Sequence, residues 1–412
     1  MRELPGRHPN RARRAAWLIR TGWAPLLWIA AAAAALLHDL LAGGDGWLPV
    51  HLALLGAVSN VIVVWSAHFA NAVLRTRDDG HAGQARRLVA LNAGVLTVVA
   101  GEVQDVLPVL VAGAVLVALA VLAHAWWLLA RLRRSLPARF SRVVRYYVAA
   151  AAMLVVGICL GVALEAGAGG DAWAPRLLVA HLTLNVVGWV SLTVVGTLVT
   201  LWPTMLRTPM GDGSETVAFA ALPLLVMAVT TSALGALLGR HVVSSLGDLA
   251  FLVVLVAVGR PLVRQARSKP PRELGALSVL AGCLWFVAGI PILAWAELRA
   301  GSWESVADTI GSVVLPMLVL GFAVQTVIGA LTYLVPVMLG GGPDAVRRSI
   351  VRVQRGGRVR LVMGNAALVG AVVLPRADAR ALCLAACVVV LLLDVGVLAL
   401  GAVSARTRAA VP

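Results

Sequence analysis

Long apolar runs separated by arginines determine what this 412-residue chain can fold into. Apolar residues make up 60% of the sequence and charged residues 13%, and the mean hydropathy is +0.90. A water-soluble domain of this size cannot cover its surface with so few polar residues. Because a bilayer leaves no water for unpaired backbone groups, the runs predict membrane-spanning helices. We therefore expect an all-α integral membrane protein, with residues 1–412 in a single polytopic domain.

The number of spans follows from the bilayer thickness, since a core of about 30 Å needs about 20 apolar residues per helix. Two short runs are marginal: 88–101 is followed by Glu102 and Asp105, and 361–375 is limited by Pro375. Ten runs meet the requirement, at about 22–42, 47–74, 106–130, 143–164, 176–205, 217–238, 242–259, 275–296, 309–339 and 381–403. Together these runs predict twelve spans.

The arginines and the single lysine test this count, because basic residues are retained on the cytoplasmic side. If the N-terminus is cytoplasmic, 30 of the 35 basic residues fall in cytoplasmic segments, and merging a marginal span with its neighbour removes the asymmetry. Twelve spans with both termini inside are therefore predicted. The outer loops hold only Arg176, Arg240, Arg299, Arg376 and Arg380.

The net charge of +16 has a different meaning here than in a nucleic-acid-binding protein. Such a protein gathers its basic residues on one folded face, whereas these lie between apolar runs. We expect the lipid bilayer as the partner and no nucleic acid. The strong preference for arginine over lysine is typical of a GC-rich genome and indicates a bacterial plasma membrane.

An internal repeat divides the chain into three units. The segment HLTLNVVGWVSLTVVGTLVTLWPTML, which begins at His181, is identical to the segment beginning at Val314 at 11 of 26 positions without gaps. A weaker copy begins at His51, 130 residues before His181. The matching spans, at about 47–74, 176–205 and 309–339, all run from outside to inside. The sequence therefore predicts three pseudo-equivalent four-helix units. His51, His181 and Val314 should then lie at one depth near the outer face.

His51 and His181 are the leading candidates for a metal or haem site. Neutral imidazole is a common ligand for iron, copper and zinc, and two histidines at equivalent depth suit that role. Buried histidines that only form hydrogen bonds remain an equal alternative. Weaker metal-ligand candidates are His38 and His241 at span ends and the thioether of Met317. Cys383 and Cys387 share one helix face, so they could bind copper or simply pack in the core.

Two carboxyls inside predicted spans, Asp248 and Asp394, form a second group of candidates. Ionisable residues are costly within a bilayer, so each indicates either a proton or ion site or an interhelical carboxyl that is neutral or paired. The residues alone leave both interpretations open.

Twelve spans in three quartets, with histidines near the outer ends of spans 2 and 6, resemble the haem-copper oxidase subunit I superfamily. The resemblance implies that His51 matches the low-spin haem ligand of span 2 and His181 the copper ligand of span 6. The paired histidines of span 7 and the His-x-His of span 10 are absent, and Val314 to Pro316 occupy the latter place. The resemblance therefore implies a protein that is not a competent oxygen-reducing oxidase on its own.

The sequence is also similar to divergent twelve-span relatives of NnrS type and to actinobacterial membrane proteins associated with multicopper oxidases. This similarity implies haem, copper or both as cofactors, in respiratory electron transfer or in nitrogen-oxide or copper handling. A multicopper oxidase, a nitrite reductase-type protein or another respiratory subunit is the implied partner. Two alternatives stay open: a proton- or ion-coupled transporter that uses Asp248 and Asp394, and a cofactor-free scaffold subunit.

Overall fold

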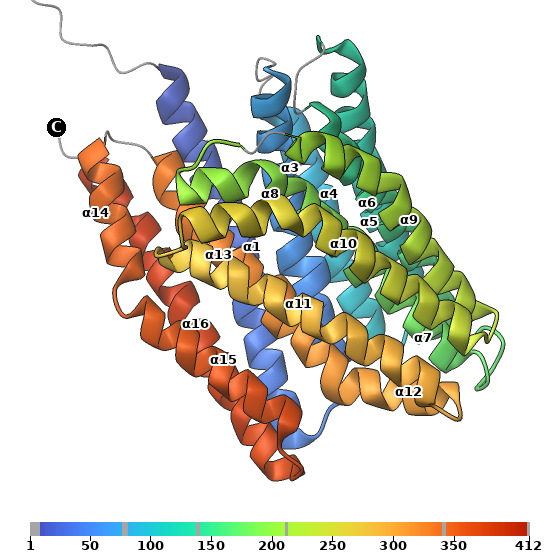
Figure 1. Cartoon of the computed structure of the whole chain (residues 1–412). Helices are drawn as coiled ribbons and strands as arrows, with labels where there is room; N and C mark the ends of the chain where they lie inside the picture. The colour runs from blue at the N-terminus through green and yellow to red at the C-terminus, as the bar shows by residue number, and fades with distance from the viewer. Residues whose placement is uncertain (1–8, 76–80, 137–140, 211–212, 340–342, 410–412) are drawn as a thin grey trace, which may run out of the picture. The chain divides into compact units, whose positions relative to one another are not determined.

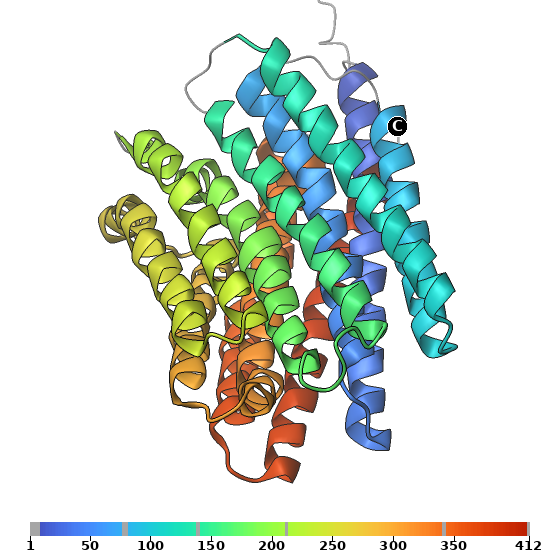
Figure 2. The ribbon, with the colours of Figure 1, turned by 90° about the vertical axis from the view of Figure 1, so that its right-hand side faces the viewer.

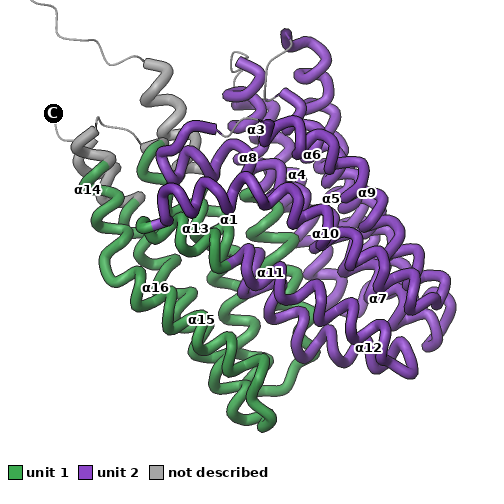
Figure 3. Tube along the Cα trace, viewed as in Figure 1, with its two compact units in different colours: residues 1–61, 272–281, 324–412 green, residues 62–271, 282–323 purple. Residues whose placement is uncertain are grey.

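The computed structural model describes residues 9–75, 81–136, 141–210, 213–339 and 343–409 (Figure 1). Within these ranges the chain forms helices and no strands, which confirms the expected all-α class. The first eight and last three residues, predicted to be cytoplasmic, lie outside the described ranges. The chain divides into two compact units built from discontinuous segments (Figure 3).

The first unit comprises residues 1–61, 272–281 and 324–412. Helix α1 packs against η1, α13 and α16, and α15 packs along α16. Ile29, Ala57 and Val395 form a buried core cluster, with Trp28 packed against it. The elements of this unit are α1 (Pro9–Ala42), α2 (Trp47–His51), the π-helix η1 (Leu52–Val58), α13 (Gln325–Leu339), α14 (Pro343–Gln354), α15 (Gly357–Val373) and α16 (Ala377–Ala409).

The second unit comprises residues 62–271 and 282–323. Figure 2 shows that the axes of its long helices are roughly aligned. The closest packing joins α4 to α5 and α9 to α10, and α6 contacts α5, α7, η3 and α8. Its elements are most of α3 (Ser59–Leu74), α4 (Ala82–Val103), α5 (Leu107–Arg134), η2 (Ser141–Val143), α6 (Val144–Glu165), α7 (Ala174–Leu182), η3 (Thr183–Val190), α8 (Ser191–Leu206), α9 (Ser214–Leu237), α10 (His241–Ser268), most of α11 (Leu274–Arg299), α12 (Trp303–Thr309), η4 (Ile310–Val314) and nearly all of η5 (Met317–Val324).

Eleven of the described helical segments are long and apolar enough to cross a membrane. This confirms a multi-pass membrane protein. The remaining predicted span, 88–101, lies within α4, which has 22 residues and is therefore about 33 Å long. Helix α4 is long enough to span, but its sequence includes Arg86, Arg87 and Asn92, and it is not among the eleven.

The internal repeat is visible in the backbone as well as in the sequence. Each copy contains a π-helix: η1 in the first, η3 in the second, and η5 in the third. When η1 is advanced by 130 residues and η5 set back by 133, both coincide with η3 to within two residues. π-helical turns are rare and often mark functional positions. Their recurrence singles out the same stretch of each repeat copy as a candidate functional region.

Candidate functional site

His51 ends α2 in the first unit, and its ring position is fixed by Trp47 one turn earlier. The imidazole stacks on the Trp47 indole with ring centroids 3.9 Å apart. Its Nδ1 lies 2.8 Å from the Trp47 carbonyl oxygen. A carbonyl can only accept a hydrogen bond, so Nδ1 carries the proton and the lone pair resides on Nε2. The helix that presents this pair begins after Gly46, whose φ of 80° favours glycine.

His181 in α7 has the same tautomer, set by a different partner. Its Nδ1 lies 2.8 Å from the carbonyl oxygen of Gly157 on α6 in the second unit. The amide nitrogen of Asn185 is 3.2 Å from Nδ1 and 3.1 Å from Nε2. These nearly equal distances place that amide midway between the ring nitrogens, and so off the axis of the Nε2 lone pair.

Two glycines of α6 make room for this arrangement. A Cβ at Gly161 would lie 2.6 Å from Cε1 of His181, and a Cβ at Gly157 would overlap the Asn185 carboxamide. A side chain at either position would displace the imidazole or its neighbour. The glycine spacing of four residues on α6 is visible in the sequence, but its connection to His181 depends on helix packing that the sequence does not give.

Both histidines therefore fit the role of metal ligand. Metal-bound imidazoles commonly donate the second ring N–H to a backbone carbonyl, which fixes the ring and its tautomer. His51 and His181 each do so, and each is followed directly by a π-helix, or nearly so. The donor chemistry suits haem iron or copper. His51 belongs to the first unit and His181 to the second.

The weaker candidates have other surroundings. His38 has a 74% exposed side chain and lies 3.6 Å from Asp39, whereas Met317 is buried, with 2% of its surface exposed. His241 stacks on Trp303 with ring centroids 4.1 Å apart. Near Trp303 and outside the predicted spans, a hydrogen bond from the Ser302 hydroxyl lowers the pKa of Glu304. In the described part of the chain, no three His, Cys, Asp or Glu side chains gather as a metal site.

Cys383 and Cys387 lie at the contact between α15 and α16 in the first unit. The Cys387 thiol is 3.5 Å from the Gly364 carbonyl oxygen. The sulfur of Cys383 lies against Gly370, where a Cβ would come within 2.6 Å of it. These contacts are those of small side chains that pack against glycines, the simpler of the two interpretations left open for this pair.

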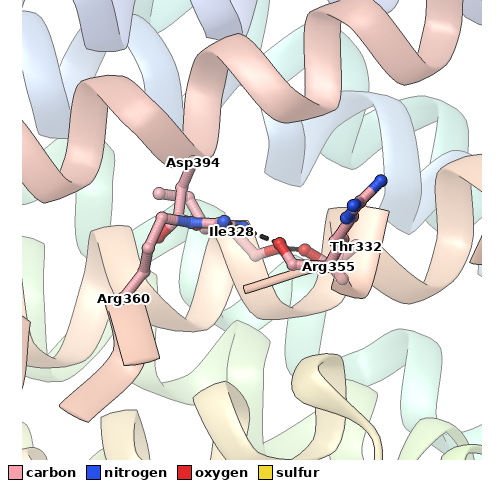
Figure 4. A network of polar contacts seen from close by, with 5 residues as sticks. All are labelled: Ile328, Thr332, Arg355, Arg360 and Asp394. Atoms are coloured by element: carbon pink, nitrogen blue, oxygen red, sulfur yellow. Dashed lines mark hydrogen bonds and ion pairs between the residues drawn. The ribbon is translucent and has the colours of Figure 1, made fainter. Parts of the chain in front are cut away.

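Asp394 forms an ion pair with Arg360 (Figure 4). Its Oδ1 accepts a hydrogen bond from Nε of Arg360 at 2.6 Å, and both side chains are at most 20% exposed. A second Arg360 nitrogen, Nη1, donates to the Arg355 carbonyl at 2.9 Å. Asp394 is thus a charge-balanced interhelical carboxylate, the second of the two interpretations of an intramembrane carboxyl.

Asp248 has a different neighbour, Glu297 of α11, which we did not predict as a site residue. Asp248 is 1% exposed and Glu297 is fully buried, and the two carboxyls interact electrostatically. Glu297 lies one residue past the predicted span 275–296 and two before Arg299, a position typical of the membrane interface. Its burial results from packing against α10, where Ser244 donates a hydrogen bond to it at 2.6 Å or accepts one from it.

Comparison with models of known families and with curated proteins finds no match for this chain.

Proposed function

We propose that this chain is a bacterial plasma-membrane protein with a degenerate haem-copper oxidase subunit I-like fold. In this proposal it has twelve spans with both termini in the cytoplasm, and it binds haem, copper or both through His51 and His181. The observation that supports it is the shared state of the two imidazoles. At equivalent positions of an internal repeat, each directs Nδ1 to a backbone carbonyl at 2.8 Å.

The protein's own residues would position the ligands. The Gly157 carbonyl holds the ring of His181 by a hydrogen bond, with the Asn185 amide packed against the ring, and Trp47 holds the ring of His51 by stacking and by its carbonyl. When bound, haem iron or copper would supply one-electron redox chemistry. This chemistry fits respiratory electron transfer or nitrogen-oxide or copper handling, with a multicopper oxidase, a nitrite reductase-type protein or another respiratory subunit as partner.

The same proposal excludes independent oxygen reduction. An oxidase of this kind needs further histidines in spans 7 and 10, and the third repeat copy has Val314, fully buried, at the equivalent position. A valine side chain offers no ligand atom. The metal would therefore carry electrons or bind a small ligand in the absence of a histidine-rich second metal site.

The test is a cofactor analysis of the purified full chain and three alanine variants. We expect a haem absorption spectrum, a pyridine haemochrome, or bound copper in the unaltered protein. His51→Ala and His181→Ala should each lose that signal at least in part, because each removes one ligand. His38→Ala is the matched control: its exposed side chain pairs with Asp39, so the signal should not change.

A colourless, metal-free and well-folded protein would contradict the proposal. Proton-coupled uptake that is lost in Asp248→Asn or Asp394→Asn would then favour the transporter. Copurification with an oxidase, without a cofactor in this chain, would favour the scaffold subunit.

A further inference from the structure

A pair of buried carboxyls without a basic partner lies among α9, α10 and α11 of the second unit. Asp248 of α10 is 1% exposed and Glu297 of α11 is fully buried. The carboxyls are close enough to repel each other electrostatically. Within the described ranges, no arginine, lysine or histidine forms an ion pair with either carboxyl. Two ionised carboxylates in this setting would be very costly, because neither solvent nor a counter-charge offsets them.

The hydroxyl of Ser244 indicates where a proton resides. Its Oγ lies 2.6 Å from Oε1 of Glu297 and 3.1 Å from the carbonyl oxygen of Ser232 on α9. A serine hydroxyl has a single hydrogen and cannot donate to both acceptors at full strength. If Glu297 carries a proton, it donates to Ser244, and Ser244 donates to the Ser232 carbonyl. Both contacts are then hydrogen bonds of normal geometry.

Three polar atoms of the pair and its neighbour lack a hydrogen bond of normal distance and angle. They are Oδ2 of Asp248, Oε2 of Glu297 and Oγ of Ser232, and all three are buried. The Ser232 hydroxyl, on a fully buried residue, faces the Asp248 carboxyl. Buried polar atoms without partners are rare in native proteins. Here two of the three belong to the carboxyl pair itself, which indicates that the pair does not hold two full negative charges.

The nearby charged and titratable groups do not neutralise the pair. On α10, His241 stacks on Trp303, and on α11, Arg299 lies 4.5 Å from the centroid of the Trp295 ring. The other titratable groups of the packed helices are distant along the chain: Glu215 at the start of α9, Cys283 in α11, and Arg260, Arg264 and Arg267 in the second half of α10.

Close helix packing favours a proton over a metal cation. A Cβ at Gly235 would overlap the backbone of Ser244, and a Cβ at Gly247 would overlap that of Ser232. Helices α9 and α10 thus touch backbone to backbone at two places near the pair. A hard cation needs about six oxygen ligands, whereas a proton needs two.

We propose that Asp248 and Glu297 form a proton-binding site in which the pair holds one exchangeable proton, carried by Glu297. Ser244 accepts the hydrogen bond from that acid, and the hydroxyl of Ser232 donates to the charged Asp248. This site does not depend on haem or copper, so it holds whether or not His51 and His181 bind a metal.

Infrared spectroscopy of the purified full chain tests the site directly. At neutral pH the protein should show the C=O band of a protonated carboxylic acid, and the band should shift in D2O. Glu297→Gln should remove the band, whereas Asp248→Asn should retain it. Ser244→Ala should move it to higher frequency, because the acid loses its hydrogen-bond acceptor.

Ser245→Ala provides the matched control. Ser245 is the next residue, equally buried, and also bonds across to α11, but to the carbonyl of Ala294 at 2.9 Å. Its loss should leave the band unchanged. If Glu297→Gln does not fold, the other two variants test the proposal. A band shift in Ser244→Ala but not in Ser245→Ala supports it, and equal bands in both contradict it. Three results would overturn the proposal: no acid band, a band that persists in Glu297→Gln, or Na+ or Ca2+ bound in the unaltered protein and lost in that variant.

Discussion

Arg360 and Asp394 form a partly buried ion pair that joins α15 to α16. Both lie at the contact of α15 with α16, beside Ile328 and Thr332 of α13 (Figure 4). Replacing Arg360 with methionine would leave the carboxylate of Asp394 partly buried and without its counter-charge. We expect Arg360→Met to lower the free energy of unfolding by about 2 kcal/mol. The measurement is denaturant-induced unfolding of the purified protein in detergent.

A double variant separates this pairing from general effects of each substitution. Arg360→Met combined with Asp394→Leu removes both charges, so it should be more stable than Arg360→Met alone. Strictly additive losses would show that the two side chains are not coupled and would contradict the prediction.

At the residue scale, Asp248 and Asp394 looked alike in the sequence, since each is a lone carboxyl within an apolar run. Their surroundings differ because lateral helix packing selects the partner. Asp394 meets Arg360, which the sequence assigned to a cytoplasmic segment, whereas Asp248 meets Glu297. Spacing along one helix predicts which residues share its face, but not which face of another helix lies opposite.

Close contact between α9 and α10 is the element-scale feature that positions the carboxyl pair. Gly247 and Gly259 are both interior to α10 and provide a matched comparison. A Cβ at Gly247 would overlap the Ser232 backbone, whereas nothing lies within 4 Å of a Cβ at Gly259. We expect Gly247→Ala to lower the free energy of unfolding by about 1–3 kcal/mol, because it overpacks the contact. Gly259→Ala should be neutral or stabilising by up to about 1 kcal/mol.

Unfolding of both variants under identical conditions checks this prediction. An equal effect of the two substitutions would show that α9 and α10 do not meet through Gly247.

The span positions could be predicted well because bilayer thickness limits their length. The run 217–238 became α9, Ser214–Leu237, and the run 242–259 became the start of α10, which continues to Ser268. The π-helices could not be predicted, because a change from an α-helical to a π-helical turn requires no particular residue pattern. Their recurrence at matching repeat positions emerged only from the backbone.

At the scale of the whole molecule, the number of spans determines the side on which each later loop lies. Eleven described segments satisfy length and composition, and an odd number would place the two termini on opposite sides. With α4 as a twelfth span, both termini lie on the same side of the membrane. Without it, the arginine-rich segments 131–145 and 260–272 would face outward, against the usual distribution of basic residues. The charge pattern therefore favours α4 as a span despite its polar start.

Cysteine labelling in intact cells tests this topology. In a variant with Cys159, Cys283, Cys383 and Cys387 replaced by alanine, a single cysteine is introduced at Gln104 or at Ser135, which flank α5. If α4 crosses the membrane, a membrane-impermeant maleimide should label Gln104→Cys from outside. Ser135→Cys should react only after permeabilisation. If α4 does not cross, the two results exchange, because α5 then runs in the opposite direction. The experiment thus distinguishes the twelve-span arrangement from the eleven-span one without depending on any cofactor.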